Sequence, residues 1–202
     1  MPFPSSPVLD TFDRADENPI AGWTTGPPAS GMKVVSNVMT GQAAGSNGAY
    51  LPTIYAGDVE MYATLSVEGG WVDILHYLFD PLSGSDTQLG YAIITNFPSS
   101  GQVSLCRRAV GSWVVNAKAS WTFAANDSLG VTKVGNLHSL YAKASGGSWA
   151  LLASAVDSVL PMSGRLGVTT DRGTGAAYND YGGGPLPAIV PYTRQRMKVS
   201  VL

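Results

Sequence analysis

The sequence predicts a single all-β domain, a two-sheet antiparallel jelly-roll sandwich with an extended C-terminal arm rich in proline and glycine. The first indication is composition: only three of the 202 residues are glutamate and 13% are charged, against about 25% in typical domains. Long helices carry such residues on their solvent face, so this chain disfavours them. The second is a run of β-rich segments separated by tight turns at roughly ten-residue intervals, which is typical of sandwiches and barrels.

The segment 58–67 alternates between apolar and polar residues, which predicts a half-buried strand with one face in the core. Its apolar face holds Val59, Met61, Ala63, Leu65 and Val67, and its polar face holds Asp58, Glu60, Tyr62, Thr64 and Ser66. We expect Asp58 and Glu60 to be exposed to solvent. The segment 71–79 is apolar on both faces and predicts an inner strand, and further strands are expected at 89–95 and 102–110.

Three turns connect the strands in the second half of the chain. Val110-Gly111-Ser112 joins 102–109 to 113–118, Gly135-Asn136 joins 129–134 to 137–144, and residues 145–148 join that strand to 149–156. Glycine and asparagine adopt a positive φ at low cost, so a Gly-Asn pair between two β-rich runs predicts a two-residue hairpin. Residues 157–161 are expected to hold one short helical turn at most.

The two ends of the chain differ from its middle. Residues 13–31 are rich in turn formers, and Gly182-Gly183-Gly184 opens a proline-rich stretch that ends in the apolar residues 197–202. We therefore predict a domain at 1–184 and an extension at 185–202. The extension either docks on a neighbouring surface or adds a strand to the domain's own sheet. The residues predicted to dock are Ile189, Val190, Tyr192 and Met197.

Charge and hydropathy argue against several classes of partner. The net charge is −2 and no basic stripe is present, which argues against nucleic-acid binding. No apolar run approaches the ~20 residues that cross a bilayer, and the N-terminus is not expected to be a signal peptide because it lacks a basic and an apolar region. Cys106 is the sole cysteine and is expected to be a buried structural thiol.

The phrase Val8-Leu9-Asp10-Thr11-Phe12-Asp13-Arg14-Ala15-Asp16, followed by Trp23, resembles the opening of concanavalin A-like (laminin-G-like) jelly rolls of bacteriophage and bacterial proteins. The resemblance extends over about residues 8–184. It includes Gly164-Arg165-Leu166-Gly167 and the triplet Asn179-Asp180-Tyr181, where the family commonly has an Asp-Asp-Phe-like triplet. It implies two packed antiparallel sheets of six or seven strands each, with the N-terminal strand beside the last one.

The same residues predict a clasp that closes the sandwich. Phe12 alternates with Asp10, so its ring is expected to enter the core. Because the resemblance places the first and last strands side by side, Arg14 is expected to form an ion pair with Asp180. Phe12, Arg14 and Asp180 are therefore predicted to be structural residues.

Catalysis is disfavoured, because the residue pairs that it needs are missing. Glycoside hydrolysis requires two carboxyls at a fixed separation, and the Glu-x-Asp-x-x-Glu strand of jelly-roll glycosidases has no counterpart here. No nucleophile elbow, zinc-binding helix or phosphate loop is found. His76 and His138 are interpreted as satisfied strand histidines, and the protein is predicted not to be an enzyme.

Two kinds of binding site remain. No cofactor is expected, although Ca²⁺ can be held by loop carboxylates and carbonyls, and the candidate ligands are Asp80, Asp86 and Asp171. Carbohydrate stacks on aromatic rings that carry polar neighbours, and the candidate rings are Trp71, Tyr91, Trp113 and Trp121. For each ring, packing in or around the core is the competing interpretation.

The leading functional hypothesis is a non-catalytic virion component, such as a capsid decoration, a head fibre or a tail-associated jelly roll. It would attach through its terminal arms to other virion proteins or to copies of itself, with adhesion to cell-surface glycans as an added role. Its location would be the virion, after synthesis in the host cytoplasm. The alternatives are a carbohydrate-binding module and, less favoured, a glycosidase or polysaccharide lyase.

Overall fold

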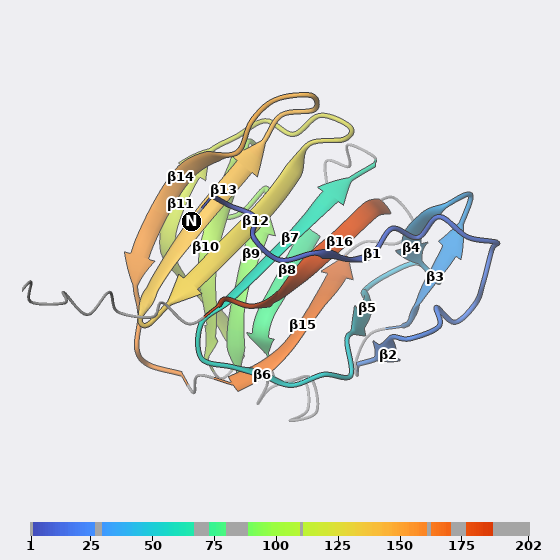
Figure 1. Cartoon of the computed structure of the whole chain (residues 1–202), viewed down its shortest axis with the longest axis horizontal. Helices are drawn as coiled ribbons and strands as arrows, with labels where there is room; N and C mark the ends of the chain where they lie inside the picture. Colours follow the sequence, from blue (N-terminus) through green and yellow to red (C-terminus); the bar gives the residue numbers. More distant parts are fainter. Residues whose placement is uncertain are drawn as a thin grey trace, which may run out of the picture.

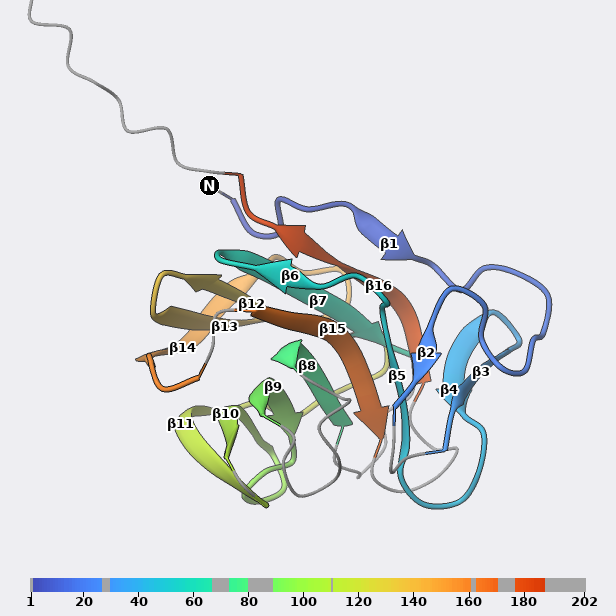
Figure 2. The same cartoon turned by 90° about the horizontal axis from the view of Figure 1, so that it is seen from below.

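The computed structural model describes residues 2–26, 30–66, 73–79, 89–109, 111–160, 163–170 and 177–187. Within this part of the chain every regular element is a strand, and no helix long and apolar enough to span a membrane is found. Two antiparallel sheets pack face to face (Figure 1, Figure 2). The predicted all-β jelly-roll sandwich is thereby confirmed.

The sheets are here called sheet I and sheet II, and each contains eight strands. Sheet I has the order β14 (Ala150–Val156), β13 (Leu137–Lys143), β12 (Ser128–Val134), β7 (Val59–Leu65), β16 (Ala177–Pro185), β4 (Val38–Gly41), β3 (Met32–Val35), with β1 (Val8–Asp10) also on β16. Sheet II has the order β11 (Ser112–Ser120), β10 (Gln102–Ala109), β9 (Gly90–Thr95), β8 (Asp73–Phe79), β15 (Ser163–Thr170), β5 (Asn47–Tyr50), β2 (Thr24–Thr25), with β6 (Tyr55–Ala56) also on β15. The predicted number of six or seven strands per sheet is too low, because residues 24–56 add several strands of two to four residues.

The predicted hairpins form where their turn residues allow a positive φ. Gly111 has φ 77° between β10 and β11, Gly135 has φ 56° between β12 and β13, and Gly146 has φ 72° before β14. Because a side chain disfavours these backbone angles, glycine fixes the points at which the chain reverses. At most one helical turn was expected at 157–161, and none forms in the described part of that segment, residues 157–160.

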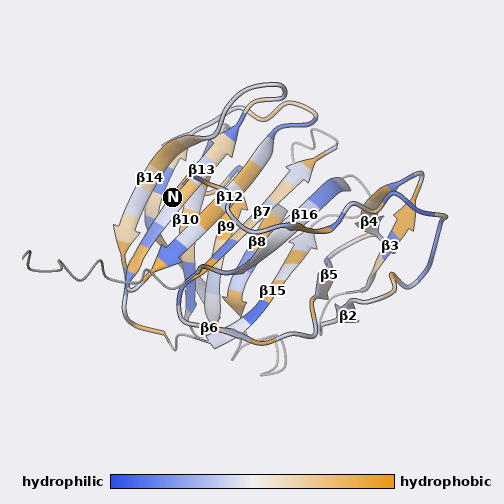
Figure 3. Cartoon of the chain, in the orientation of Figure 1, coloured by the Kyte–Doolittle hydropathy of each residue, from blue (hydrophilic) through white to orange (hydrophobic). Residues whose placement is uncertain are grey.

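The core lies between the sheets and follows the two-residue alternation of each strand. Leu75 and Tyr77 face it from β8, Tyr91 and Ile93 from β9, and all four are at most 1% exposed. Figure 3 shows apolar and polar residues interspersed along the strands.

β7 is buried on both faces, so the expected half-buried strand is wrong. The N-terminal residues 2–7 lie against its outer face, where Glu60 is only 1% exposed. Its Oε1 accepts hydrogen bonds from the Ser5 backbone N–H at 2.6 Å, from the Ser5 hydroxyl and from the Ser6 backbone N–H. Asp58 is half-buried and accepts a hydrogen bond from the Gly135 N–H at 2.7 Å. Both carboxylates thus have structural partners, and neither is free in solvent.

The same N-terminal segment places Phe3 in an aromatic box formed by Tyr62, Tyr141 and Trp149. The Phe3 ring stacks on Tyr141 with centroids 4.3 Å apart and meets Trp149 edge-on at 4.7 Å. Gly130 lies beneath it, and a Cβ there would collide with the ring. These contacts hold the N-terminus on the outer face of sheet I.

We expect Phe3→Ala to lower the free energy of unfolding by about 2–3 kcal/mol, because it removes apolar burial and two ring pairs. Urea unfolding measures this change, and the Trp149 contribution to fluorescence should shift to the red. Leu9→Ala is the control, because Leu9 is 42% exposed and its loss should cost about 0.5 kcal/mol or less. Equal effects of the two substitutions would show that the segment is not held in the box.

The N-terminal strand lies beside the last one, as predicted, with Val8 opposite Gly182 and Asp10 opposite Tyr181. Phe12 is fully buried in the core, which confirms its expected place. The predicted Arg14–Asp180 ion pair is wrong. Arg14 binds the nearer Asp10, with Nη1 and Oδ1 2.5 Å apart, and Glu17, with Nε and Oε1 2.6 Å apart.

Asp10 is instead the centre of the clasp. Its carboxylate also accepts hydrogen bonds from the Phe12 N–H at 2.9 Å and from Trp23 Nε1 at 3.0 Å. The Trp23 ring packs edge-on against Tyr181 of β16, at 5.0 Å between centroids. The clasp therefore joins the two ends of the domain through an aromatic contact, and the hydrogen bond to Asp10 positions Trp23.

The Asp10 carboxylate should make stability depend on pH. Burial alone would raise the pKa of Asp10, but hydrogen bonds from Arg14, Trp23 and Phe12 outweigh it and hold the pKa below 3.8. A depressed pKa gives stability that is present above the unfolded value of about 3.9 and is lost as the pH falls through the folded value. We expect Asp10→Asn to cost roughly 1.5–3 kcal/mol near neutral pH, and much less near pH 3.

Urea unfolding of both proteins at the two pH values measures this difference. Asp13→Asn is the matched control, because Asp13 is an exposed carboxylate in the same loop. A destabilisation by Asp10→Asn that stays constant between the two pH values would contradict this account.

Candidate functional site

The outer face of sheet II carries a row of ring side chains. His76 points outward from β8, and its ring lies 4.1 Å from that of Phe79 and 6.2 Å from that of Trp113 on β11. Tyr50 of β5 stacks on Phe79 with centroids 5.7 Å apart. Phe79 joins this face, and not the core face of Leu75 and Tyr77, because the strand is irregular just before it.

The irregularity is at Leu78, which has a φ of +51°. A bulky residue rarely adopts this conformation, and such strain persists where its surroundings enforce it. The pairing of β8 with β15 shifts register at the same place. Two glycines on the neighbouring strands make room for it: a Cβ on Gly90 would lie 2.7 Å from Phe79 Cα, and one on Gly164 would lie 2.5 Å from Phe79 N. Three strands are therefore adapted to one local distortion.

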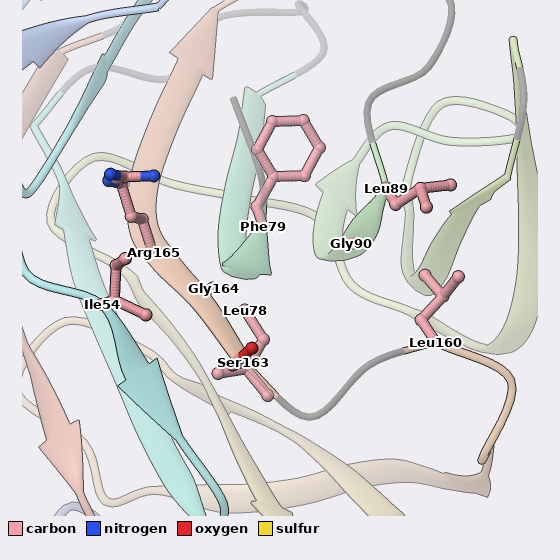
Figure 4. Close-up of a pocket in the computed structure, with 9 residues that line it drawn as sticks. All are labelled: Ile54, Leu78, Phe79, Leu89, Gly90, Leu160, Ser163, Gly164 and Arg165. Carbon is pink, nitrogen blue, oxygen red and sulfur yellow. The ribbon is translucent and has the colours of Figure 1, made fainter. Parts of the chain in front are cut away.

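A pocket of about 300 Å³ opens directly over this distortion. Its described lining comes from β8, β9 and β15 and from the segments that precede β6, β9 and β15. The nine described residues that line it are Ile54, Leu78, Phe79, Leu89, Gly90, Leu160, Ser163, Gly164 and Arg165 (Figure 4). Arg165 is the direct partner of Phe79 in the β15–β8 ladder. In Figure 4 the Phe79 ring lies between the Arg165 guanidinium and the Leu89 side chain.

The pocket combines one cation with apolar walls. Arg165 is half-buried, and no described acidic side chain lies within ion-pair distance of it. Ser163 contributes the one hydroxyl among these nine described lining residues, and none of the nine is acidic. A largely apolar pocket with a few convergent polar groups is the usual form of a small-molecule site. We therefore take this pocket as the candidate functional site.

The rings predicted to bind carbohydrate do not come together. Tyr91 is fully buried in the core, with its hydroxyl donating to Asp157 Oδ1 at 3.1 Å, so it offers no platform for a ligand. Trp121 is half-buried against the core and donates from Nε1 to Asp127 Oδ2 at 3.2 Å. Trp113 lies on the outer face of sheet II, where Arg108 packs 5.3 Å above its ring. Trp71 lies outside the described residues.

The other predicted site residues are placed as follows. Asp80, Asp86 and Asp171 lie outside the described residues, as do Ile189, Val190, Tyr192 and Met197. Within the described part of the chain, no group of three His, Cys, Asp or Glu side chains forms a metal site.

The two histidines and the cysteine have structural roles. His138 is bonded on both ring nitrogens, to the Tyr77 hydroxyl at 3.0 Å and to the Asp157 carbonyl at 3.2 Å, as predicted. His76 contacts Thr169 Oγ1 through Nε2 at 2.8 Å, but its buried Nδ1 has no partner, so it is only partly satisfied. Burial, with Arg108 nearby, lowers the pKa of His76 to about 3. Cys106 is buried as expected, and burial raises its thiol pKa to about 12.

The lining of the pocket was not identified from the sequence. Gly164-Arg165-Leu166-Gly167 was interpreted as a marker of the fold, although it places a cation between two glycines on one strand. That pattern was the available signal, because each glycine marks a place where a neighbouring strand or ring approaches the backbone closely: Leu78 and Phe79 at Gly164, and Tyr50 at Gly167. The partners of Arg165 come from separate parts of the chain, so no local motif contains them.

Comparison with known proteins supports the fold. No family model and no curated protein matches the chain. Among solved structures, the carbohydrate-binding module CBM66 from Bacillus subtilis is 17% identical, with a TM-score of 0.60 over 81% of this chain and 95% of that one. The VIP36 exoplasmic/lumenal domain in its Ca²⁺/Man2-bound form is 14% identical, with a TM-score of 0.64 over 90% and 88%.

A β-glucanase from Bacillus licheniformis is also similar, at 12% identity and a TM-score of 0.62 over 90% of this chain and 98% of that one. These similarities confirm the two-sheet antiparallel jelly-roll fold that the sequence phrase implied. Binding proteins and a glucanase share it, so the fold alone does not distinguish binding from catalysis.

Proposed function

We propose that this protein is a carbohydrate-binding domain whose pocket over β8, β9 and β15 holds the sugar. The observation that carries the proposal is the pocket itself: a half-buried guanidinium with no acidic partner among the described residues, beside a ring and aliphatic walls and over a strained strand. Apolar walls suit the C–H faces of a pyranose, and polar groups at the rim fix its orientation. Similar folds in a carbohydrate-binding module and in a Man2-bound domain support this assignment.

The proposed activity is binding without hydrolysis. A glycosidase needs two carboxyl groups about 5–10 Å apart across the scissile bond, and none of the nine described residues that line the pocket is acidic. Glu60, the buried carboxylate of β7, lies on sheet I and is already bound by Ser5 and Ser6. The chemistry of the pocket therefore favours recognition.

Arg165→Gln is expected to weaken carbohydrate binding by about tenfold or more, because a hydrogen bond to a charged group contributes roughly 1.5–3 kcal/mol. A glycan array identifies a ligand, and isothermal titration calorimetry then gives the two dissociation constants. Lys118→Gln is the matched control, because Lys118 is an exposed cation on β11, outside the pocket lining.

Two results would contradict the proposal. One is a wild-type protein that binds no carbohydrate on a broad array. The other is carbohydrate binding that Arg165→Gln and Lys118→Gln leave equally unchanged, which would place the sugar elsewhere.

A virion role is the second candidate, with the same domain attached to a particle and located there. It rests on the resemblance of residues 8–16 to jelly rolls of bacteriophage proteins and on the apolar C-terminal extension. β16 continues to Pro185 and the Leu186 N–H donates to Asp58 O at 3.0 Å, so a deletion that spares the domain starts at residue 188. The 188–202 deletion should abolish attachment to particles and leave the unfolding curve unchanged; unaltered attachment would overturn this candidate.

A further inference from the structure

We infer that the pocket selects a sugar residue that carries a carboxylate, as in a uronic or sialic acid. This inference rests on the proposed function and specifies its ligand class. It starts from Arg165, whose side chain is half-buried at the pocket and has no described acidic partner. The other arginines of the described part of the chain are engaged: Arg14 with Asp10 and Glu17, Arg107 with Asp157, and Arg108 over Trp113.

Among the described lining residues, the remaining polar groups of the pocket are few. Ser163 supplies one hydroxyl, while Ile54, Leu89 and Leu160 supply aliphatic surface. A neutral sugar presents hydroxyl groups on most of its carbons and loses their hydration when it is enclosed, which costs free energy unless each group finds a partner. The described lining, with Ser163 and Arg165 as its polar side chains, offers too few partners for that. A single charge-assisted, bidentate contact to a carboxylate compensates better, because such bonds are roughly twice as strong as neutral ones.

The geometry suits a ligand with a charged end and an apolar face. Ser163 and Arg165 are two residues apart on β15, so both project from the same face of the strand. The Phe79 ring and Leu89 extend the wall away from the guanidinium (Figure 4). At about 300 Å³ the pocket is at the small end of ligand sites, so it fits one sugar ring and not a long chain.

The nearest competing ligand shares this chemistry. A short fatty acid also joins a carboxylate to an apolar body, so its binding must be tested beside the sugars. The sugar is favoured because Ile54 is 62% exposed and Ser163 is exposed. The pocket is therefore open to water at one side, whereas a fatty acid requires an enclosed apolar channel to bury its chain.

The test compares acidic sugars with their own methyl esters, which keep the ring and lose the charge. The probes are oligomers of galacturonate, glucuronate and mannuronate, sialyllactose, their methyl esters, neutral glucose and mannose oligomers, and octanoate. Calorimetry is run on the wild type, Arg165→Gln, Arg165→Lys and the control Lys118→Gln. We expect at least one acid to bind about tenfold or more tightly than its ester, with the difference abolished in Arg165→Gln and reduced in Arg165→Lys.

The outcomes separate the two proposals. If neutral sugars or esters bind as tightly as every acid, the inferred selectivity is wrong and the proposed carbohydrate-binding function stands. If no sugar binds at all, the proposed function fails and this inference fails with it. If octanoate alone binds, and does so through Arg165, the guanidinium recognises carboxylates but the sugar assignment is overturned. A circular dichroism spectrum and an unfolding curve for each variant show that it is folded.

Discussion

Replacing Asp157 by alanine is expected to lower the free energy of unfolding by about 3–5 kcal/mol, the cost of removing one partner from a buried charged network. Asp157 follows β14 of sheet I and is 8% exposed. Its carboxylate accepts hydrogen bonds from Tyr91 at 3.1 Å and from Asn116 at 2.8 Å, and lies 3.5 Å from Arg107 Nε. These three partners belong to β9, β11 and β10 of sheet II, so Asp157 connects the two sheets at their free edges.

The loss is large because it leaves buried donors without acceptors, in addition to removing the contacts themselves. Guanidinium unfolding at neutral pH measures it. Asp157→Asn keeps an acceptor but not the charge, so its free energy of unfolding should lie between those of the wild type and of Asp157→Ala. Asp13→Ala removes an exposed carboxylate and should change stability by about 0.5 kcal/mol or less. If Asp157→Ala were no more destabilising than Asp13→Ala, the network would not hold the sheets together.

The second large effect is expected from Gly164→Ala, which should cost about 3 kcal/mol, at the upper end of the usual range for overpacking. A Cβ at this position would enter the backbone of Leu78 and Phe79 on the adjacent strand. Backbone atoms in a ladder cannot move aside as a flexible side chain does, so β8 and β15 would have to separate. Because Phe79 of β8 and Arg165 of β15 both line the pocket, this separation should weaken the binding of any ligand as well.

Gly147→Ala is the matched control, because that glycine lies in an exposed turn and its added Cβ would come within 3.1 Å of Ala144 O. Thermal unfolding compares the two variants, and calorimetry follows ligand binding. A Gly164→Ala protein with wild-type stability and affinity would show that the distortion at Leu78 is not fixed by its neighbours.

The strands and hairpins were predictable because their signals are local. Alternating hydropathy and the positive-φ glycines Gly111 and Gly135 lie within the segments that they shape. Glu60 was wrongly expected in solvent because the chain that covers it, at Ser5 and Ser6, is more than fifty residues away in sequence. Neither the hydropathy alternation of a strand nor a turn motif carries information about a contact between residues so far apart in sequence.

The clasp and the pocket show the same limit. Alternation along the sequence predicted the burial of Phe12 correctly, although β1 ends at Asp10 and Phe12 has a φ of 54°. The partner of Arg14 was predicted wrongly, because the side chain pairs with Asp10 and Glu17, which are near in sequence, and not with the distant Asp180. The pocket depends on a distortion at Leu78 that turns Phe79 outward, and on glycines from two other strands. These residues meet only when β8, β9 and β15 pair, so sequence spacing does not indicate the site.

The central claim, carbohydrate bound at Arg165, is tested most directly by NMR titration of ¹⁵N-labelled protein with the sugar that binds best. The claim predicts that amide shifts concentrate at Leu89, Gly90, Ser163, Gly164 and Arg165, and that they disappear in Arg165→Gln. Shifts centred instead on Trp113 or on the aromatic box of Tyr62, Tyr141 and Trp149, with these pocket amides unmoved, would contradict it.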